Sequence, residues 1–395
     1  MRMANWRQCK LGDVVNLKRG YDLPHQHRKP GPFAVVSSSG TTDYHAEAKV
    51  KGPGVVTGRY GTLGEVFYVS NDFWPLNTSL YVEDFKGNDP KFISYFLRQL
   101  DFGTRNAAGA VPGVNRNHLH AMDVTIAPLP VQRRVAGILS TYDELIENNK
   151  RRIQILEDVA RALYRAWFVN FRFHGHQDSQ RNASSLGNIP MGWEVAALRD
   201  VTTKIGSGAT PRGGKEAYKT TGTSLIRSLN IYDYQFEFSN LAFIDDDQAA
   251  QLDNVVVEQC DVLLNITGAS VARCSMVPSE ILPARVNQHV AIVRANPRYM
   301  DPYFLLDSIN NDQNKQKLLG LAQGGATREA LTKDTISNFL ILLPPRDLVL
   351  KYGELAGPLH SQRETLNRQI QNLRRTRDLL LPRLLSGQVD IPTMK

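Results

Sequence analysis

Short apolar runs alternate with glycine, proline and asparagine through residues 1–127 and 190–343. Runs of this kind predict β-strands. Pro90–Leu100 instead carries apolar side chains three and four residues apart, a spacing that predicts a helix. The predicted strands are Val35–Val36, Gly54–Thr57, Glu65–Val69, Ser79–Val82, Ser224–Arg227, Asp261–Ile266 and His289–Val293. Each of the two segments is therefore predicted to be an α+β domain.

A longer periodic segment follows each pair of prolines near the end of these domains. Apolar residues recur in alternating steps of four and three, which predicts a coiled-coil seam with one stutter around Asn149. The first seam comprises Val131, Val135, Ile138, Tyr142, Leu145, Asn149, Ile153, Leu156, Ala160, Leu163 and Trp167. The second comprises Leu366, Ile370, Leu373, Arg377, Leu380 and Leu384. Two helices of roughly 40 residues, about 60 Å each, are expected to pair antiparallel. The alternative is that each packs on its own domain as an ordinary amphipathic helix.

The two halves of the chain also resemble each other. The pattern W-x4-L-x-D-V begins at Trp6 and again at Trp193. Further matches follow in the same order at Val55 and Val262, Asp89 and Asp301, Ile126 and Ile341, and Ile153 and Ile370. The offset between partners only grows along the chain, which indicates an internal repeat with insertions in the second copy.

Composition adds little beyond the exclusion of several protein classes. Of 395 residues, 42% are hydrophobic and 22% charged, an ordinary globular mixture. The net charge of +8 and the pI of about 9.3 permit a polyanionic partner without proving one. Three cysteines without metal-ligand spacing favour a reducing compartment. With no signal peptide and no apolar stretch of spanning length, the chain is expected to be cytoplasmic.

Motifs for catalysis were sought and not found in the sequence. Gly206–Pro211 is the nearest approach to a glycine-rich cofactor loop, and its proline breaks the pattern. Asn296–Tyr299 lacks the aromatic clamp of amino-methyltransferases. Asp43 and Glu47 could be forced into a nuclease-like acidic set, but a solvated turn is the simpler interpretation. We therefore expect a non-catalytic chain with no cofactor or metal of its own.

Loops that interleave glycine with basic and amide residues suggest nucleic acid as the partner. Glycine lets a backbone approach phosphate, and Arg, Asn and Gln can bond to purine edges. The alternative is ordinary turns with exposed basic residues. Residue type, loop placement and repeat position give the candidate DNA contacts Arg59, Asn77, Asn115, Arg116, Arg212, Arg227, Asn230, Asn287, Gln288 and Arg328. Phe168, Phe171 and Phe173 lie off the seam and suggest an additional partner.

Four motifs resemble the specificity subunit of type I restriction-modification systems. Gly187–Glu194 is similar to the G-x-x-P-x-G-W-E entry to that family's second recognition domain. Gln132–Leu139 and Leu163–Phe171 look like the start and end of its central conserved helix, and Leu379–Gly387 like its C-terminal signature. Arg346–Leu350 departs from the family's usual opening of the distal helix.

The resemblance implies two target-recognition domains and two antiparallel helices, in five segments. These are a first recognition domain, a central spacer helix, a linker, a second recognition domain and a distal spacer helix, at 1–130, 131–173, 174–189, 190–345 and 346–395. Each domain would recognise one half of a bipartite, asymmetric duplex DNA target through the major groove. The helices would set the unread gap between the halves.

The resemblance also implies partners that carry the chemistry. Two methyltransferase subunits would bind S-adenosylmethionine and methylate adenine, and two restriction subunits using ATP and Mg²⁺ could join them. Two other hypotheses remain open at this stage. One is a coiled-coil scaffold without sequence-specific DNA binding, and the other is a self-contained DNA methyltransferase. DNA competition assays and S-adenosylmethionine binding by the isolated chain would distinguish them.

Overall fold

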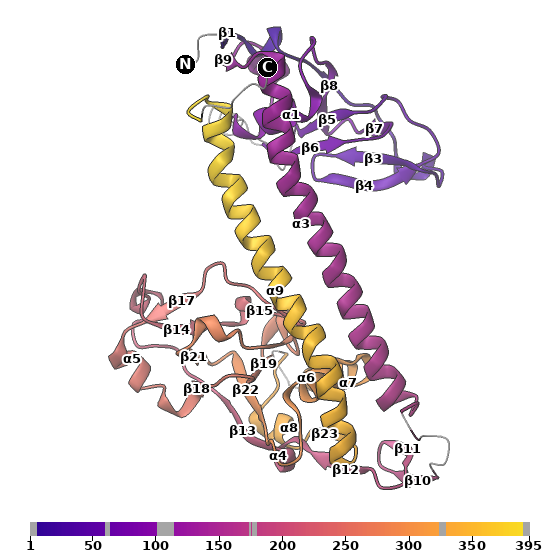
Figure 1. Ribbon diagram of the computed structural model, residues 1–395, viewed down its shortest axis with the longest axis vertical. Helices are drawn as coiled ribbons and strands as arrows, with labels where there is room; N and C mark the ends of the chain where they lie inside the picture. Colours follow the sequence, from indigo (N-terminus) through magenta and orange to yellow (C-terminus); the bar gives the residue numbers. More distant parts are fainter. Residues whose placement is uncertain are drawn as a thin grey trace. The chain divides into compact units, whose positions relative to one another are not determined.

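The chain is divided into two compact units. A computed structural model describes residues 6–59, 64–100, 114–173, 175, 180–323 and 329–389. Unit 1 comprises Met1–Asn149 and Gln369–Lys395, and unit 2 comprises Lys150–Arg368. Each unit contains a domain of mixed helices and strands together with a part of each long helix (Figure 1).

Unit 1 contains two main sheets. One has the antiparallel order β2-β8-β5-β6, the other has the order β4-β3-β7, and β1 pairs separately with β9. Its strands are β1 (Arg7–Lys10), β2 (Asn16–Arg19), β3 (Phe33–Ser37), β4 (Gly40–His45), β5 (Gly54–Gly58), β6 (Val66–Val69), β7 (Phe73–Pro75), β8 (Ser79–Asp84) and β9 (Asp123–Ile126). Its shorter helices are α1 (Pro90–Gln99) and α2 (Arg116–His120).

Unit 2 contains two four-stranded sheets with the orders β13-β22-β19-β20 and β17-β14-β21-β18. Its strands are β10 (Arg181–Ser184), β11 (Gly187–Pro190), β12 (Glu194–Ala197), β13 (Thr202–Ser207), β14 (Thr223–Ile226), β15 (Ile231–Tyr232), β16 (Gln235–Phe236), β17 (Ala242–Ile244), β18 (Val256–Val257), β19 (Val262–Asn265), β20 (Cys274–Met276), β21 (Ala284–Val286), β22 (Val290–Ala295) and β23 (Leu340–Leu343). Its shorter helices are α4 (Leu198–Val201), α5 (Asp246–Ala250), α6 (Pro302–Asn310), α7 (Asp312–Gln323) and α8 (Lys333–Ser337). All seven strands predicted from the sequence, and the helix at 90–100, are confirmed in the two units.

The internal repeat is visible in the strand connections. β12 pairs with β23 as β1 pairs with β9, and β13-β22-β19-β20 repeats the order of β2-β8-β5-β6. A parallel pair occurs in each unit, β3 with β7 and β14 with β21. The predicted repeat therefore corresponds to one α+β fold used twice.

The helices α1 and α6 show why the repeated sequences fold alike. Asp89 accepts a hydrogen bond from the Phe92 amide at 2.8 Å, and Asp301 accepts one from the Tyr303 amide at 2.8 Å. Each aspartate is an N-cap followed directly by proline. Proline is tolerated there because the first N–H groups of a helix have no hydrogen-bond partner within the helix. Both helices then bury most of their length against the sheets.

The two long helices are α3 (Leu129–Tyr164), which ends in a π turn at Arg165–Val169, and α9 (Arg346–Leu385). Their segments in unit 1, which end at Asn149 and begin at Gln369, lie side by side and run antiparallel (Figure 1). Within unit 1, Arg377 Nη1 donates to Asp143 Oδ1 at 2.6 Å and Asn149 Nδ2 donates to Gln369 Oε1 at 3.2 Å. Moving forward along α3 thus means moving backward along α9, as predicted. Neither helix has a stretch apolar enough to cross a membrane, and the same holds for the other described helices.

The buried face of α3 differs from the predicted seam at one point. Leu145 is 46% exposed, whereas the neighbouring Ile146 is buried. The reason is that α3 also packs on the domain of unit 1 through Gln132 and Leu139, so its buried stripe is wider than a coiled-coil seam. Asn149 is buried, as predicted.

Two further expectations are corrected in unit 2. Phe168 is buried in the main hydrophobic cluster of unit 2, and Phe171 and Phe173 pack against that cluster, so they contribute to the core instead of marking a partner site. The segment expected to be a linker at 174–189 includes β10 and most of β11, which pair as a hairpin. Alternation was hard to see there because β10 is mostly polar and exposed, and only the last two residues of β11, Ile189 and Pro190, are buried.

Candidate nucleic-acid interface

Three candidate residues of unit 1 come together at the carboxyl end of β5. The Arg59 amide donates to the Thr78 carbonyl at 3.1 Å, and the Arg59 carbonyl accepts from the Val114 amide at 2.9 Å. Thr78 and Val114 are the chain neighbours of Asn77 and Asn115. Strand ends joined by backbone hydrogen bonds therefore place Arg59, Asn77 and Asn115 at one edge of the sheet. Asn77 also donates to Asp22 Oδ1.

The fourth candidate of unit 1, Arg116, begins the helix α2 and is exposed. Asn115 caps this helix by accepting from the Asn117 amide at 2.9 Å, so part of its hydrogen-bonding capacity is structural. Burial, with the charge of Arg116 as a further cause, lowers the pKa of His120. The neutral His120 Nε2 accepts from the Leu17 amide at 2.9 Å and joins α2 to β2.

The corresponding edge of unit 2 contains three more candidates. β14 and β21 are parallel, so their carboxyl ends lie at the same edge and bring Arg227 beside Asn287 and Gln288. The Asn287 amide donates to the Ile226 carbonyl at 3.0 Å, and the Asn287 carbonyl accepts from the Gly208 amide at 3.1 Å, which adds the end of β13.

Asn230 and Asn287 have structural roles, contrary to their selection as DNA contacts. Asn230 is fully buried, and its side chain accepts from the Arg227 amide at 3.0 Å and donates to the Glu237 carbonyl at 2.9 Å. Asn287 is 7% exposed and accepts from the His289 amide at 3.0 Å. Asparagine also suits tight turns, where its amide satisfies backbone groups, and this use of the two side chains leaves them less free to contact DNA.

Gln288 takes part in a polar chain at the edge of unit 2. Its Nε2 lies 3.0 Å from His289 Nε2, and His289 Nδ1 lies 2.6 Å from Thr267 Oγ1. Gln288 Oε1 is buried and has no hydrogen-bond partner within the described structure. Because a buried amide oxygen without a partner is costly, this side chain is suited to receive a donor from a ligand.

The remaining candidates of unit 2 are the arginines. Arg227 is half-buried, lies 5.0 Å from the Tyr218 ring centroid and donates to the Asn240 carbonyl. Arg212 is exposed, and only its backbone is anchored, by the Gln248 side chain. Arg328 lies outside the described residues.

Matching hydrogen bonds align the two units residue by residue. The Leu76 amide donates to the Val36 carbonyl as the Asn287 amide donates to the Ile226 carbonyl, so the next residues, Asn77 and Gln288, are equivalent. The Val114 amide donates to Arg59 as the Leu331 amide donates to Ile266, which makes Arg116 equivalent to Lys333. Lys333 was not among the candidates. The signal for it was present, because V-N-R at Val114–Arg116 aligns with L-T-K at Leu331–Lys333.

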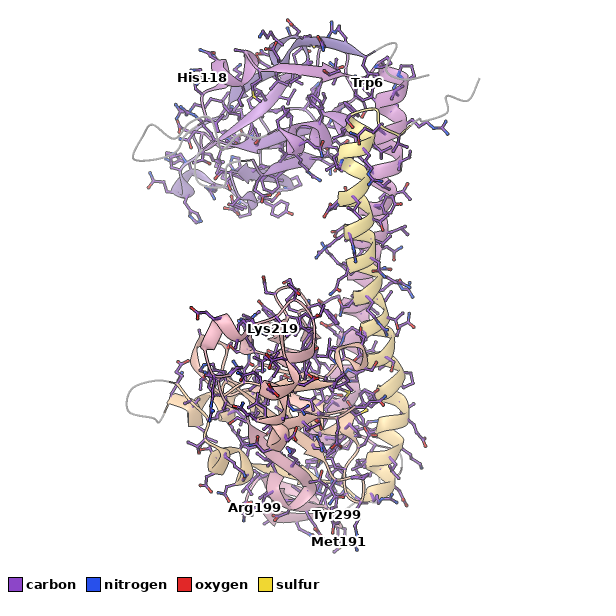
Figure 2. All side chains as sticks on the ribbon, turned by 90° about the vertical axis from the view of Figure 1, so that its left-hand side faces the viewer. Trp6, His118, Met191, Arg199, Lys219 and Tyr299 are labelled. Carbon is purple, nitrogen blue, oxygen red and sulfur yellow. The ribbon has the colours of Figure 1, made fainter. Side chains whose placement is uncertain are left out.

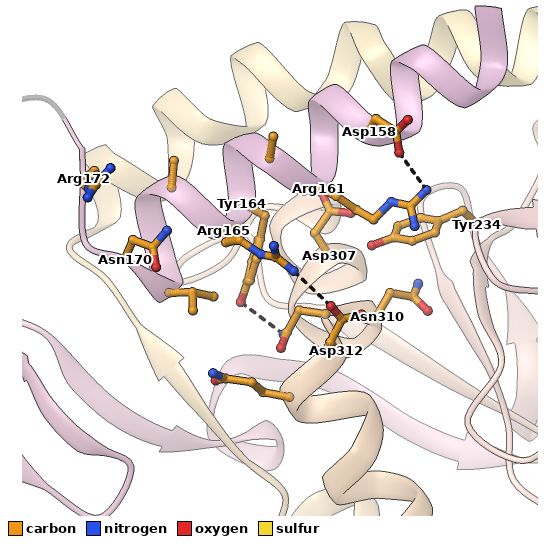
Figure 3. A pocket seen from close by; sticks show the side chains of 15 residues that line it. Asp158, Arg161, Tyr164, Arg165, Asn170, Arg172, Tyr234, Asp307, Asn310 and Asp312 are labelled. Atoms are coloured by element: carbon orange, nitrogen blue, oxygen red, sulfur yellow. Dashed lines mark hydrogen bonds and ion pairs between the residues drawn. The ribbon is translucent and has the colours of Figure 1, made fainter. Parts of the chain in front are cut away.

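A different kind of site, a pocket of about 820 Å³, lies beside α3, its π turn and the start of α7 in unit 2 (Figure 3). Its buried carboxylate, Asp307, accepts from Tyr352 Oη at 2.6 Å and lies 3.0 Å from His360 Nε2. These contacts tie α6 to α9, so the cluster has a structural role. The described residues contain no group of three potential metal ligands, here or elsewhere.

Comparisons with known proteins agree with this arrangement. Residues 3–158 match the type I restriction modification DNA specificity domain. The chain is 25% identical over 304 residues to the type I restriction enzyme MjaIX specificity subunit of Methanocaldococcus jannaschii, covering 76% of this chain and 67% of that protein. It is 21% identical to the HindI specificity subunit of Haemophilus influenzae, covering 98% and 100%.

The fold has a counterpart among solved structures. The type I restriction-modification S subunit from M. genitalium superposes with a TM-score of 0.66 at 15% identity, covering 98% of this chain and 97% of that one. In sequence and in fold, the chain is similar to type I restriction-modification specificity subunits, and residues 3–158 match the DNA specificity domain of that family.

Proposed function

We propose that the chain is the DNA specificity subunit of a type I restriction-modification complex. Unit 1 and unit 2 would each recognise one half of a bipartite target in duplex DNA. The observation that carries this proposal is the repeat: one α+β fold occurs twice, and each copy gathers polar and basic residues at the same sheet edge. Equivalent positions differ, as Asn77 and Gln288 do, so the two half-sequences are expected to differ and the target to be asymmetric.

The long helices suit the role of a spacer between the two half-sites. Both α3 and α9 cross the boundary between the units. Helices of 36 and 40 residues rise by about 1.5 Å per residue, and duplex DNA by about 3.4 Å per base pair. The paired helices would keep the number of base pairs between the half-sites constant. Because the two units are linked, binding of one unit raises the effective concentration of the other at its half-site.

The chemistry is assigned to partner subunits. Two methyltransferase subunits would bind S-adenosylmethionine and methylate adenine, and restriction subunits would use ATP and Mg²⁺. A repeated fold presents similar surfaces twice, which suits two copies of one partner. This chain would contribute recognition alone, since its polar edges offer hydrogen-bond donors and acceptors for base edges and phosphates.

Methylome sequencing of a host that expresses the chain with its methyltransferase subunit tests the proposal. The expected result is one bipartite motif with methylated adenine in each half and a fixed gap. A continuous motif contradicts the two-unit arrangement. No methylation, together with equal affinity for target and random duplexes, supports the scaffold instead, and S-adenosylmethionine binding by the isolated chain supports a self-contained methyltransferase.

A further inference from the structure

A groove of about 550 Å³ runs between the strand β13 and the short helix α8 in unit 2. β13 is the edge of its four-stranded sheet, so one side of it faces the groove. Three cations, Arg199, Lys204 and Lys333, line the groove together with hydroxyl and amide side chains such as Ser207, Ser337 and Asn254. Among its described lining residues there is no carboxylate.

The cations of this groove are available for a ligand. Lys204 and Lys333 form no ion pair within the described structure, and Lys333 is exposed. Arg199, which lies at the surface of unit 2 (Figure 2), donates to Asn338 Oδ1 and has its Nε 3.6 Å from Asp200 Oδ1. The Arg199 and Asp200 side chains are 57% and 59% exposed, so solvent screens this pair and the groove stays positive.

Unit 1 has a matching pair of cations. Arg116 is equivalent to Lys333, as the backbone hydrogen bonds show. Lys18 lies on β2, the edge strand equivalent to β13, and the charges of Lys18 and Arg116 are close enough to interact. The pairing of β2 with β8 and of β13 with β22 makes Leu17 equivalent to Ile205. Lys18 therefore lies two residues beyond the position equivalent to Lys204. Because side chains alternate along a strand, the two lysines lie on the same face. Lys18 is held by Glu83 at 2.5 Å, which leaves Arg116 as the more available cation.

We propose that the groove between β13 and α8 binds backbone phosphates of the DNA duplex, and that Lys18 and Arg116 do the same in unit 1. The inference deepens the proposed function and rests on it. Phosphate contacts position a protein on DNA without distinguishing sequences, whereas base contacts specify. Arg116 and Lys333 keep a cation at one equivalent position, and each has a lysine on the same face of the neighbouring edge strand. This is the distribution expected of positioning contacts in two units that differ at Asn77 and Gln288.

The chemistry of the groove favours phosphate over a base edge. Lysine is a compact point charge that pairs with a phosphate oxygen, and serine hydroxyls can donate to the same group. The competing occupant is an acidic segment of a protein partner. The two differ in salt dependence, because each neutralised phosphate releases condensed counterions and adds about 0.9 to the slope of log affinity against log salt.

The test compares Lys204→Gln/Lys333→Gln with the control Arg298→Gln/Lys317→Gln in the full chain assembled with its methyltransferase subunit. The control removes the same charge from exposed positions of unit 2 outside the groove. Affinity is measured between 50 and 200 mM salt for the target duplex and for one with a scrambled second half. We expect the groove variant to lose about 2 from the slope and on the order of tenfold in affinity for both duplexes. The control should keep the slope, and Arg116→Gln alone should lose about 1.

An unchanged slope in Lys204→Gln/Lys333→Gln and in Arg116→Gln overturns the proposal. So does a loss confined to the target duplex, which would make these residues base readers. Loss of the methyltransferase subunit with an intact slope identifies the acidic protein segment as the occupant. If the unsubstituted complex shows no preference for the target duplex, the proposed function fails, while the comparison of slopes still decides whether the groove binds phosphate.

Discussion

At the scale of single residues, an amide side chain can either contact a base edge or satisfy a buried backbone group. Asn230 satisfies buried backbone groups, since its amide oxygen accepts from the Arg227 amide and its amide nitrogen donates to the Glu237 carbonyl. Gln288 is half-buried at the sheet edge and leaves Oε1 without a partner within the described structure. Sequence alone could not separate these two, because residue type and loop placement are alike and only burial distinguishes them.

This distinction leads to a reciprocal prediction for the two half-sites. Gln288→Ala should relax the preference for bases in the half recognised by unit 2, by about 1–3 kcal/mol for a lost bidentate contact. Arg59→Ala should weaken binding through the other half and leave the preference of unit 2 intact. The measurement is binding of the complex to duplexes that carry single base changes in either half.

Asn230→Ala is the matched control for that prediction. It removes a buried amide, leaves the Arg227 amide and the Glu237 carbonyl without their side-chain partner, and should lower thermal stability. The base preference of the protein that remains folded should not change. If Gln288→Ala and Asn230→Ala gave the same pattern, Gln288 would have to be removed from the interface.

At the scale of elements, the joint between β2 and α2 in unit 1 depends on a neutral histidine. His120 Nε2 accepts from the Leu17 amide, and burial lowers the pKa of His120 from its ordinary value of 6.5. The unfolded chain therefore binds the proton more readily than the folded chain does. The contribution of His120 to stability is fully present above pH 6.5 and is lost as the pH falls from 6.5 through the folded pKa.

We accordingly predict that acidification loosens this joint before the rest of unit 1. Hydrogen exchange of the Leu17 amide, corrected for its intrinsic pH dependence, should accelerate between pH 7.5 and pH 5.5. His120→Gln should abolish the acceleration in that window. His27→Gln, at an exposed histidine of the same unit, should leave it unchanged. A wild-type response identical to that of His120→Gln would contradict the prediction.

The elements also show what sequence patterns can and cannot establish. Apolar runs bounded by turn residues predicted seven strands, and a spacing of three and four residues predicted α1, because these elements bury one face or both in the cores. They placed Leu145 on the seam and missed Ile146, since α3 packs on two neighbours at once. They also missed β10 and β11, because β10 is mostly polar and exposed and β11 buries only Ile189 and Pro190, which gives no alternation.

At the scale of the whole molecule, the internal repeat could be predicted from the sequence, whereas the candidate DNA contacts at the sheet edges could not. Tryptophan, aspartate-proline and proline-pair motifs recur because they cap helices and close domain cores, so their spacing reports the shared fold. Sheet-edge positions such as Asn77 and Gln288 differ between the copies, so the repeat pattern does not identify them. Lys333 became evident once hydrogen bonds aligned the two units, although the short match of V-N-R with L-T-K already pointed to it.

The last prediction concerns the proposed spacer. Insertion of seven residues after Asn149 in α3 and of seven before Gln369 in α9 adds two turns to each helix and preserves the seven-residue period of the buried seam. Seven residues lengthen a helix by about 10.5 Å, which corresponds to about three base pairs at 3.4 Å each. We expect the methylome of a host with this variant to show the same two half-sequences, with a gap about three base pairs longer.

Insertion into α3 alone is the control. It lengthens one helix while its partner keeps its length, so the residues of α3 after Asn149 lose their register with α9, which should lower thermal stability and abolish methylation. An unchanged gap in the double insertion would show that the helices do not set the spacing, and altered half-sequences would show that the units do not recognise DNA independently.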